Sequence, residues 1–134
     1  MTSILVVEDN ELSRDMLTRR LQLRGYTVTA VADGTEAVAL APQLQPDIIL
    51  MDMSLPIMDG WQATRFLKSA AATDRIPVIA LTAHAMASDE LRCREAGCDG
   101  FETKPIDLAR LCSTIEGMIW GQHAASAADG GLRK

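Results

Sequence analysis

The feature of this chain that most constrains its fold is a fivefold alternation between short apolar, β-branched runs and longer segments with helical spacing of apolar residues. This alternation predicts βαβ units, and therefore a parallel sheet of the α/β class. Because crossovers between parallel strands are right-handed, the sheet is expected to be open and doubly wound, with helices on both faces. The predicted strands are residues 4–7, 27–31, 47–52, 77–81 and 98–103.

Apolar spacing and capping residues locate the helices between these strands. The second predicted helix begins at an N-cap acid, since Asp33 is followed three residues later by Glu36, and it ends near Pro42. The third starts near residue 59, the fourth covers about 86–96 and the fifth begins at 107. The first helix ends at Gly25 and carries apolar residues at Leu12, Met16, Leu17 and Leu21.

Length and charge restrict the functions that this chain can serve. With 134 residues and a net charge of −5, it fits one domain and lacks the Lys/Arg cluster that binding to nucleic acid or an anionic membrane requires. No apolar run approaches the roughly 20 residues of a membrane span. The run at 4–7 is too short for a signal peptide, so we expect a cytoplasmic protein. We expect a domain over 1–120 and a flexible tail over 121–134, which is rich in Ala and Gly.

The cysteines favour a reducing compartment. Cys93, Cys98 and Cys112 are odd in number and have no CxxC spacing. This pattern predicts free thiols rather than a disulfide framework or a metal site.

Polar and charged residues stand at the carboxyl ends of four of the five predicted strands. Any one of them could be an ordinary solvated loop residue. Since ligands of open parallel sheets gather beyond the carboxyl ends of the strands, four such ends on one edge predict a binding site. In strand order, these residues are Glu8 and Asp9, then Asp52, then Thr82, and finally Lys104 and Pro105.

Negative charge dominates the predicted site. Each pair of carboxylates about 4 Å apart costs about 4 kcal/mol at an effective dielectric constant near 20. Lys104 offsets one charge, and a divalent cation that prefers oxygen ligands, such as Mg²⁺, would offset two more. Such a site suits phosphoryl transfer, in which a carboxylate nucleophile becomes an acyl phosphate. Thr82 and Lys104 supply donors for phosphoryl oxygens.

Four short motifs, taken in order, resemble the receiver domains of two-component response regulators. The resemblance covers about residues 3–119. It implies a flavodoxin-like fold with five parallel strands in the order 2-1-3-4-5 and five helices. The motifs are Val7-Glu8-Asp9-Asn10, Met51-Asp52-Met53-Ser54-Leu55-Pro56 with Met58-Asp59-Gly60, Leu81-Thr82-Ala83, and Lys104-Pro105.

The resemblance implies roles for the acidic residues. Asp52 is the phosphoacceptor, and its phosphoryl group comes from a phosphohistidine on a histidine kinase or a phosphotransfer protein. Asp9 and Asp52 bind Mg²⁺ directly, with Mn²⁺ as an alternative ion. Glu8 binds the ion mainly through water, and the backbone carbonyl of Ser54 completes the protein ligands. Such a domain is a signalling module rather than an enzyme, although it assists its own phosphorylation and dephosphorylation.

The resemblance also implies a switch. Thr82 and Lys104 bind the phosphoryl oxygens, and the added charge of about −1.5 to −2 draws Thr82 toward them. Phe101 then rotates inward into the vacated space; a plain core aromatic is the alternative role for this residue. The peptide bond before Pro105 is expected to be cis. His84 is expected on the rim of the site, with an ordinary surface histidine as the alternative.

The stretch 82–86 resembles both stand-alone regulators of the DivK type and the receivers of hybrid histidine kinases. The stand-alone form is favoured because no output domain follows and Met1 lies just before the first strand; a receiver excised from a hybrid kinase or a multidomain regulator is the alternative. We expect a downstream protein to bind the face formed by the fourth helix, fifth strand and fifth helix. The chain is expected to be a monomer or a weak dimer.

Three other functions fit the sequence less well. An aspartyl phosphatase needs an acid two residues after its nucleophile, where this chain has Ser54. A flavin-binding electron carrier needs a Ser/Thr/Gly-rich loop after the first strand, where Glu8 and Asp9 would repel phosphate. A degenerate receiver that only docks is disfavoured because the acidic pair Glu8 and Asp9, together with Asp52, Thr82 and Lys104, is intact.

Overall fold

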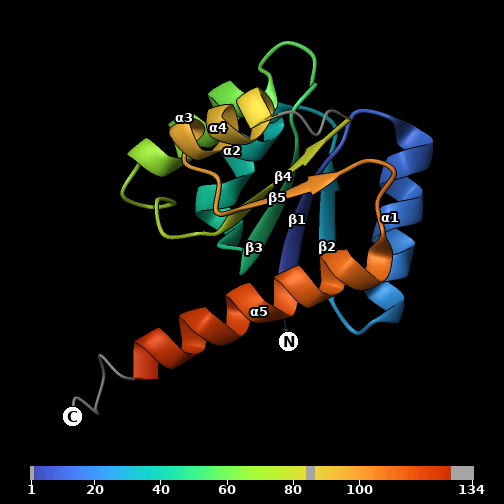
Figure 1. Cartoon of the computed structure of the whole chain (residues 1–134), viewed down its shortest axis with the longest axis vertical. Coiled ribbons are helices and arrows are strands. Elements are labelled where there is room, and N and C mark those ends of the chain that lie inside the picture. The colour runs from blue at the N-terminus through green and yellow to red at the C-terminus, as the bar shows by residue number, and fades with distance from the viewer. Residues whose placement is uncertain (1, 84–86, 128–134) are drawn as a thin grey trace.

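The computed structural model describes residues 2–83 and 87–127 (Figure 1). Five strands alternate with five helices, in the predicted order. The elements are β1 (Ser3–Val7), α1 (Glu11–Leu23), β2 (Thr27–Val31), α2 (Gly34–Leu44), β3 (Ile48–Asp52), α3 (Gly60–Ser69), β4 (Val78–Thr82), α4 (Ala87–Ala96), β5 (Gly100–Thr103) and α5 (Leu108–Ala127).

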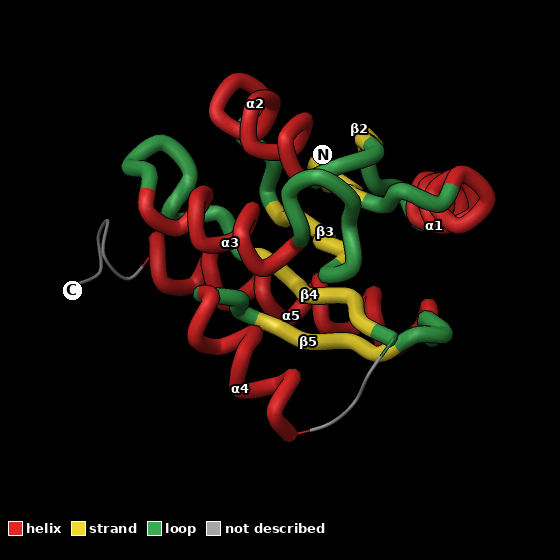
Figure 2. The backbone as a smooth tube through the Cα atoms, turned by 90° about the horizontal axis from the view of Figure 1, so that it is seen from above, coloured by secondary structure: helices red, strands yellow, loops and turns green. Residues whose placement is uncertain are grey.

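The strands form one parallel sheet in the order β2-β1-β3-β4-β5, which confirms the predicted topology. Val6 of β1 lies opposite Ala30 on one side and Leu50 on the other, and Met51 of β3 lies opposite Ala80 of β4. Figure 2 shows the strands edge to edge, with helices on both sides of the sheet. The chain moves outward from β1 to β2 and then returns past β1 to β3. The carboxyl ends of β1 and β3 therefore flank the crevice where such sheets bind ligands.

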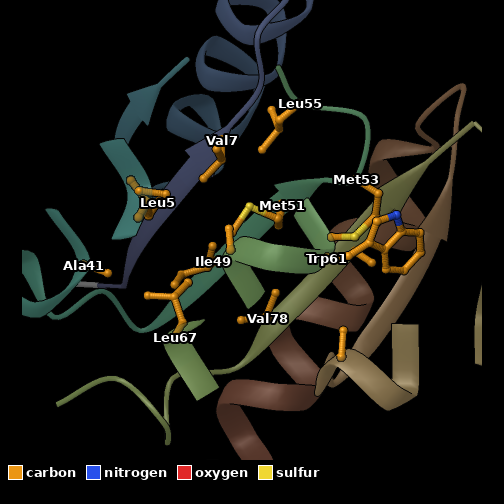
Figure 3. Packing of buried hydrophobic residues seen from close by; sticks show 14 of the residues in the cluster. Leu5, Val7, Ala41, Ile49, Met51, Met53, Leu55, Trp61, Leu67 and Val78 are labelled. Atoms are coloured by element: carbon orange, nitrogen blue, oxygen red, sulfur yellow. The ribbon is translucent and has the colours of Figure 1, made fainter. Parts of the chain in front are cut away.

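The strands are apolar on both faces because helices cover both faces. Successive side chains of a strand point to opposite sides of a sheet. Leu5 and Ile49 therefore pack in one core with α2, α3 and α4, and part of this core is drawn in Figure 3. Their neighbours Ile4 and Ile48 pack in a second core with α1 and α5. All four side chains are fully buried.

Side-chain caps start the two helices that follow β1 and β2. The Asn10 side chain accepts a hydrogen bond from the Ser13 backbone N–H at 2.9 Å, and Asp33 accepts one from the Glu36 N–H at 2.8 Å. The predicted N-cap at Asp33 is confirmed. These bonds satisfy amide groups that would otherwise lack a partner in the first turn of each helix.

Not every apolar residue of the predicted helices reaches a core. Leu12 and Met16 of α1 are 78% and 50% exposed, whereas Leu17 and Leu21 are buried. Residues four apart share one stripe of a helix, so the two pairs lie on neighbouring stripes about 100° apart, and only the second stripe faces the sheet. In α3, Phe66 is exposed by the same geometry.

The two tryptophans differ strongly in exposure. Trp61 of α3 is 7% exposed and belongs to the core shared by α2, α3 and α4. The Arg92 guanidinium of α4 lies over its ring, 4.4 Å from the ring centroid, and this cation–π contact links α4 to α3. Trp120 of α5 is 75% exposed.

The last helix is longer than the sequence suggested. It extends to Ala127, so residue 121, where the tail was expected to begin, lies inside α5. Figure 1 shows this end of α5 continuing away from the sheet. Alanine has the highest helix propensity, which explains why the Ala-rich stretch continues the helix. Residues 128–134 lie outside the described part of the chain. Within that part, no helix combines the length and the apolar character that a bilayer crossing requires.

Candidate functional site

Three carboxylates meet at the crevice. Glu8 and Asp9 follow β1, and Asp52 ends β3, the strand beside β1. One carboxylate oxygen from each lies within 4.8 Å of the others. Glu8 and Asp52 are 3% and 1% exposed, whereas Asp9 is exposed. The cluster is therefore open to solvent on the side of Asp9.

Lys104 reaches the acids from the end of β5. Its Nζ lies 3.0 Å from Glu8 Oε1 and 3.2 Å from Asp52 Oδ2. The Lys104 backbone N–H donates to the Thr82 carbonyl at 2.7 Å, which holds the residue beside the end of β4. The Lys104–Pro105 peptide bond is cis, as the resemblance implied. The structure thus brings one ammonium group between two buried carboxylates.

The loop after β3 fixes the Asp52 carboxylate. The backbone N–H and the hydroxyl of Ser54 both donate to Asp52 Oδ1, each at 3.1 Å. Gly60 begins α3 against the same stretch of backbone, and its N–H donates to the Met53 carbonyl at 3.2 Å. A Cβ on Gly60 would lie only 2.4 Å from the Asp52 carbonyl oxygen. Only glycine allows this close approach.

Two residues to which the sequence motifs gave no role, Asn10 and Arg14, support the acid pair. The Asn10 backbone N–H donates to Glu8 Oε2 at 3.2 Å. Arg14 Nη1 donates to the carbonyls of Glu8 and Asp9, at 3.0 and 3.4 Å. Asn10 had a usable signal, because Asn is a preferred N-cap residue and precedes a helical run. Arg14 had none, since bonds to backbone carbonyls leave no pattern in the sequence.

Burial and charge shift the pKa values in the site. Burial raises the pKa of Glu8, and its contact with Asp52 raises it further, against the lowering effect of Lys104. Burial also acts to raise the pKa of Asp52, but the hydrogen bond from the Ser54 backbone, the adjoining Glu8 and the Lys104 ammonium outweigh burial and leave this pKa below its ordinary value. Burial acts to lower the pKa of Lys104, and the two acids raise it above its ordinary value. Asp52 is therefore the carboxylate kept ionised.

The remaining predicted residues lie around this centre. Thr82 is the last residue of β4 and is 5% exposed. Phe101 of β5 is half-buried, packs against the core beneath α2, α3 and α4, and lines a pocket of about 300 Å³ with residues of α4. His84 lies outside the described residues.

The donor set fits a hard divalent cation. Three carboxylates and one ammonium group leave two negative charges, which a divalent ion would balance. All three side chains offer oxygen, the donor that Mg²⁺ prefers, and the exposed position of Asp9 leaves room for water ligands. Glu8, Asp9 and Asp52 are the residues that would hold such an ion.

The fold and this acidic crevice define a class of signalling domain. Residues 4–116 match the family model of the response regulator receiver domain. Because this match spans most of the chain, the protein belongs to that family. It is a receiver domain of two-component signalling, which confirms the family and the fold class inferred from the motifs.

Individual relatives make the assignment more particular. The chain is 40% identical to the polar-differentiation response regulator DivK of Brucella anthropi over 117 residues, which cover 87% of this chain and 95% of DivK. It is also 40% identical to the receiver domain of a sensor histidine kinase of Pseudomonas aeruginosa, with a TM-score of 0.82 and coverage of 88% and 97% of the two chains. That crystal structure has a magnesium ion coordinated in its active site cleft. A receiver domain of a histidine kinase from Syntrophus aciditrophicus is 36% identical, with a TM-score of 0.84 and coverage of 90% and 92%.

These comparisons decide between the functions weighed from the sequence. The family match favours a receiver domain over the aspartyl phosphatase and the flavin-dependent electron carrier. The relatives include a DivK response regulator and receivers of histidine kinases, which are the two contexts that the stretch 82–86 suggested.

Proposed function

We propose that Asp52 accepts a phosphoryl group from a phosphohistidine on a histidine kinase or a phosphotransfer protein. The observation that carries this proposal is the state of the Asp52 carboxylate. It is 1% exposed, held by two hydrogen bonds from Ser54, and placed 3.2 Å from the Lys104 ammonium. A buried carboxylate that is both ionised and oriented is prepared to act as a nucleophile.

The residues of the site contribute mainly position and charge to this transfer. A carboxylate oxygen of Asp52 attacks phosphorus, the P–N bond to the imidazole breaks, and its electron pair leaves with the imidazole. Lys104, 3.2 Å from Asp52 Oδ2, neutralises charge on the phosphoryl oxygens, and the Thr82 hydroxyl at the end of β4 offers a further donor. The same groups assist hydrolysis of the acyl phosphate, so the domain resets itself without acting as an enzyme on other substrates.

Magnesium is the proposed cofactor, with Mn²⁺ as an alternative. Glu8, Asp9 and Asp52 would hold the ion, together with the backbone carbonyl of Ser54. When bound, a divalent ion neutralises phosphoryl charge and removes the repulsion among the three carboxylates. The residual charge of the cluster, three acids against Lys104, supports this assignment.

The acyl phosphate is proposed to act through Thr82 and Phe101. The phosphoryl group adds a charge of about −1.5 to −2 next to Thr82 and draws its hydroxyl inward. Phe101 then follows into the space that Thr82 leaves, and its half-buried position in β5 supports this movement. The surface formed by α4, β5 and α5 changes and binds a downstream protein. The domain works in the cytoplasm, as a monomer or a weak dimer.

Acetyl phosphate provides a direct test of the phosphoacceptor. The folded protein is incubated with acetyl phosphate and Mg²⁺, and the intact mass is measured. The wild type and the control Asp74→Asn, which changes an exposed carboxylate, are expected to gain one phosphoryl group. Asp52→Asn, and the wild type in EDTA, are expected to gain none. Equal labelling of the wild type and Asp52→Asn would overturn the assignment.

A further inference from the structure

Two of the three thiols lie together at the C-terminal end of α4. The Cys98 N–H donates to the Cys93 carbonyl at 2.9 Å, the Gly97 N–H donates to the Arg94 carbonyl at 3.0 Å, and Gly97 has φ +102°. These features form a Schellman motif, whose outer residues characteristically bring their side chains into contact. Here the outer residues are Cys93 and Cys98, and their thiols lie close enough to shift each other's pKa.

The surroundings of the two thiols differ in access. Cys93 is 1% exposed and belongs to the core shared by α2, α3 and α4, whereas Cys98 is half-buried against the same core. Both line the pocket of about 300 Å³ between α4 and β5 that also contains Phe101. A small reagent can reach Cys98 through this pocket. Cys112 lies in the second core, with α1 and α5, so the sheet separates it from the pair.

We propose that Cys93 and Cys98 are an oxidisable pair that forms an intramolecular disulfide in response to a hydroperoxide. A disulfide requires Cα atoms about 4.4–6.8 Å apart and Cβ atoms that face each other. The 2.9 Å hydrogen bond between the two backbones and the approach of the two side chains that is typical of a Schellman motif favour both conditions.

The reaction proceeds in two balanced steps. The Cys98 sulfur attacks one peroxide oxygen, the O–O bond breaks, and Cys98 sulfenic acid and one water or alcohol molecule result. The Cys93 sulfur then attacks the Cys98 sulfur, the S–O bond breaks, and the hydroxyl leaves as water with the proton of Cys93. Two thiols lose two electrons in total, and the hydroperoxide gains them.

The order of the two thiols follows from their surroundings. Burial raises the pKa of Cys93 to about 12 and also raises the pKa of Cys98, but the neighbouring side chains of Thr64 and, to a smaller extent, Cys93 oppose that rise at Cys98. Cys98 is thus the more accessible thiol and the one whose thiolate is assisted, so it reacts first and Cys93 resolves the sulfenic acid.

Peptide mapping after peroxide treatment tests the proposal. The folded protein is treated with hydrogen peroxide, denatured, labelled with N-ethylmaleimide and measured as an intact mass. The untreated protein, with its three free cysteines, is expected to take three labels and the oxidised protein one, on Cys112. Trypsin cleaves after Arg92 and Arg94, so Cys93 and Cys98 fall in separate peptides. The expected product is peptide 93–94 linked to the peptide that contains Cys98.

Two variants and one condition serve as controls. Cys112→Ala is expected to form the linked peptide as the wild type does, because this residue lies on the other face of the sheet. Cys98→Ala is expected to abolish the linked peptide and to leave Cys93 open to labelling after denaturation. Protein oxidised in urea is expected to give mixed pairings. Three labels on the treated wild type, a link to Cys112, or covalent dimers in place of the 93–98 link would overturn the proposal.

Discussion

At the scale of single residues, Glu8 is an acid whose surroundings disfavour its ionised form. Its carboxylate is 3% exposed, adjoins the Asp52 carboxylate and shares the Lys104 ammonium with it. Burial and Asp52 raise its pKa above the ordinary value of 4.5. An acid whose pKa is raised by folding destabilises the folded state when it ionises. Ionised Glu8 therefore lowers the free energy of unfolding of the metal-free protein.

Replacing Glu8 by glutamine is expected to stabilise the metal-free protein at neutral pH. Because the folded-state pKa lies above the unfolded value, the cost of ionised Glu8 is fully present above the folded pKa and disappears as the pH falls below 4.5. The advantage of Glu8→Gln should therefore vanish in acid. Urea denaturation in EDTA, at neutral pH and well below pH 4.5, measures the difference in the free energy of unfolding between the wild type and Glu8→Gln under both conditions.

The control for this variant is Glu95→Gln, which changes an exposed carboxylate on α4 and should leave the free energy of unfolding unchanged. An advantage of Glu8→Gln that persisted in acid would show that packing, not ionisation, is responsible.

Magnesium should stabilise the wild type more than Glu8→Gln. A ligand at about 100 times its dissociation constant raises the free energy of unfolding by about 2.7 kcal/mol. The wild type is expected to gain this amount, and Glu8→Gln less, since the variant offers the ion one charge fewer. Thermal melts across a Mg²⁺ titration give the comparison. Equal stabilisation of both proteins by Mg²⁺ would show that Glu8 does not contribute to metal binding.

At the scale of elements, hydrogen bonds of Lys68 in α3 connect three segments of the chain. Its Nζ donates to the Ile76 carbonyl and to Asp99 Oδ2, each at 2.8 Å, and the same Asp99 oxygen accepts the N–H of Val78. These bonds fasten the end of α3 to the start of β4 and to the turn before β5. The Lys68 side chain is 18% exposed, so solvent screens the contacts only in part.

Lys68→Met keeps most of the aliphatic stem and removes the ammonium. We expect a loss of about 1–2 kcal/mol, because a charged hydrogen-bond donor leaves partly buried acceptors behind. Arg94→Met is the matched control, since it breaks the Glu90–Arg94 pair, whose side chains are 50% and 74% exposed. That loss should stay below about 0.5 kcal/mol. Urea denaturation of both variants measures the two losses in the free energy of unfolding. Equal losses would contradict the stabilising role of the Lys68 hydrogen bonds.

Gly60 provides a second comparison at this scale. Gly60→Ala would place a Cβ 2.4 Å from the Asp52 carbonyl oxygen and 2.7 Å from Met53 Cα, and neither backbone atom can move freely. We expect a loss of about 1–3 kcal/mol from overpacking, together with slower phosphorylation by acetyl phosphate. Gly117→Ala in α5 meets nothing within 4 Å and should gain about 0.5–1 kcal/mol from helix propensity. Unchanged phosphorylation of folded Gly60→Ala would refute the proposed support of Asp52.

The sequence predicted the positions of the helices and strands better than it predicted which face of a helix is buried. Strands such as β3 were predictable because burial on both sides requires a continuous apolar run. The exposure of Met16 was not, since two apolar stripes of α1 compete and only tertiary packing selects one. The acids and Lys104 were predictable as strand ends. The contact between Cys93 and Cys98 was missed, although Gly97 after a helical run was a usable signal for the Schellman motif.

At the scale of the whole molecule, one sheet separates two cores. Leu67 of α3 belongs to one and Leu111 of α5 to the other, and they are 1% and 0% exposed. Strands β1, β3 and β4 contribute alternate residues to both cores. Loss of either core would expose one face of the strands that also form the other core, and would weaken that core as well. This shared sheet predicts a single cooperative unfolding transition.

Leu67→Ala and Leu111→Ala test this cooperativity. Each is expected to cost about 2–5 kcal/mol, the range for a buried leucine that leaves a cavity. Because the two side chains lie on opposite faces of the sheet, the double variant should be additive within about 0.5 kcal/mol. Urea denaturation followed by circular dichroism gives the values. A biphasic curve for either single variant would mean that the two cores unfold separately.

The cation–π contact between Arg92 and Trp61 gives the domain an optical sensor of its own. Trp61 is one residue past Gly60, and its indole is shielded in the core, whereas Trp120 stands in solvent. Emission from Trp61 should be blue-shifted and resistant to acrylamide, and emission from Trp120 should be red-shifted and easily quenched. A rearrangement near Asp52 that moves α4 relative to α3 would alter the first signal and spare the second. Such a rearrangement would therefore be readable by fluorescence in the unlabelled protein.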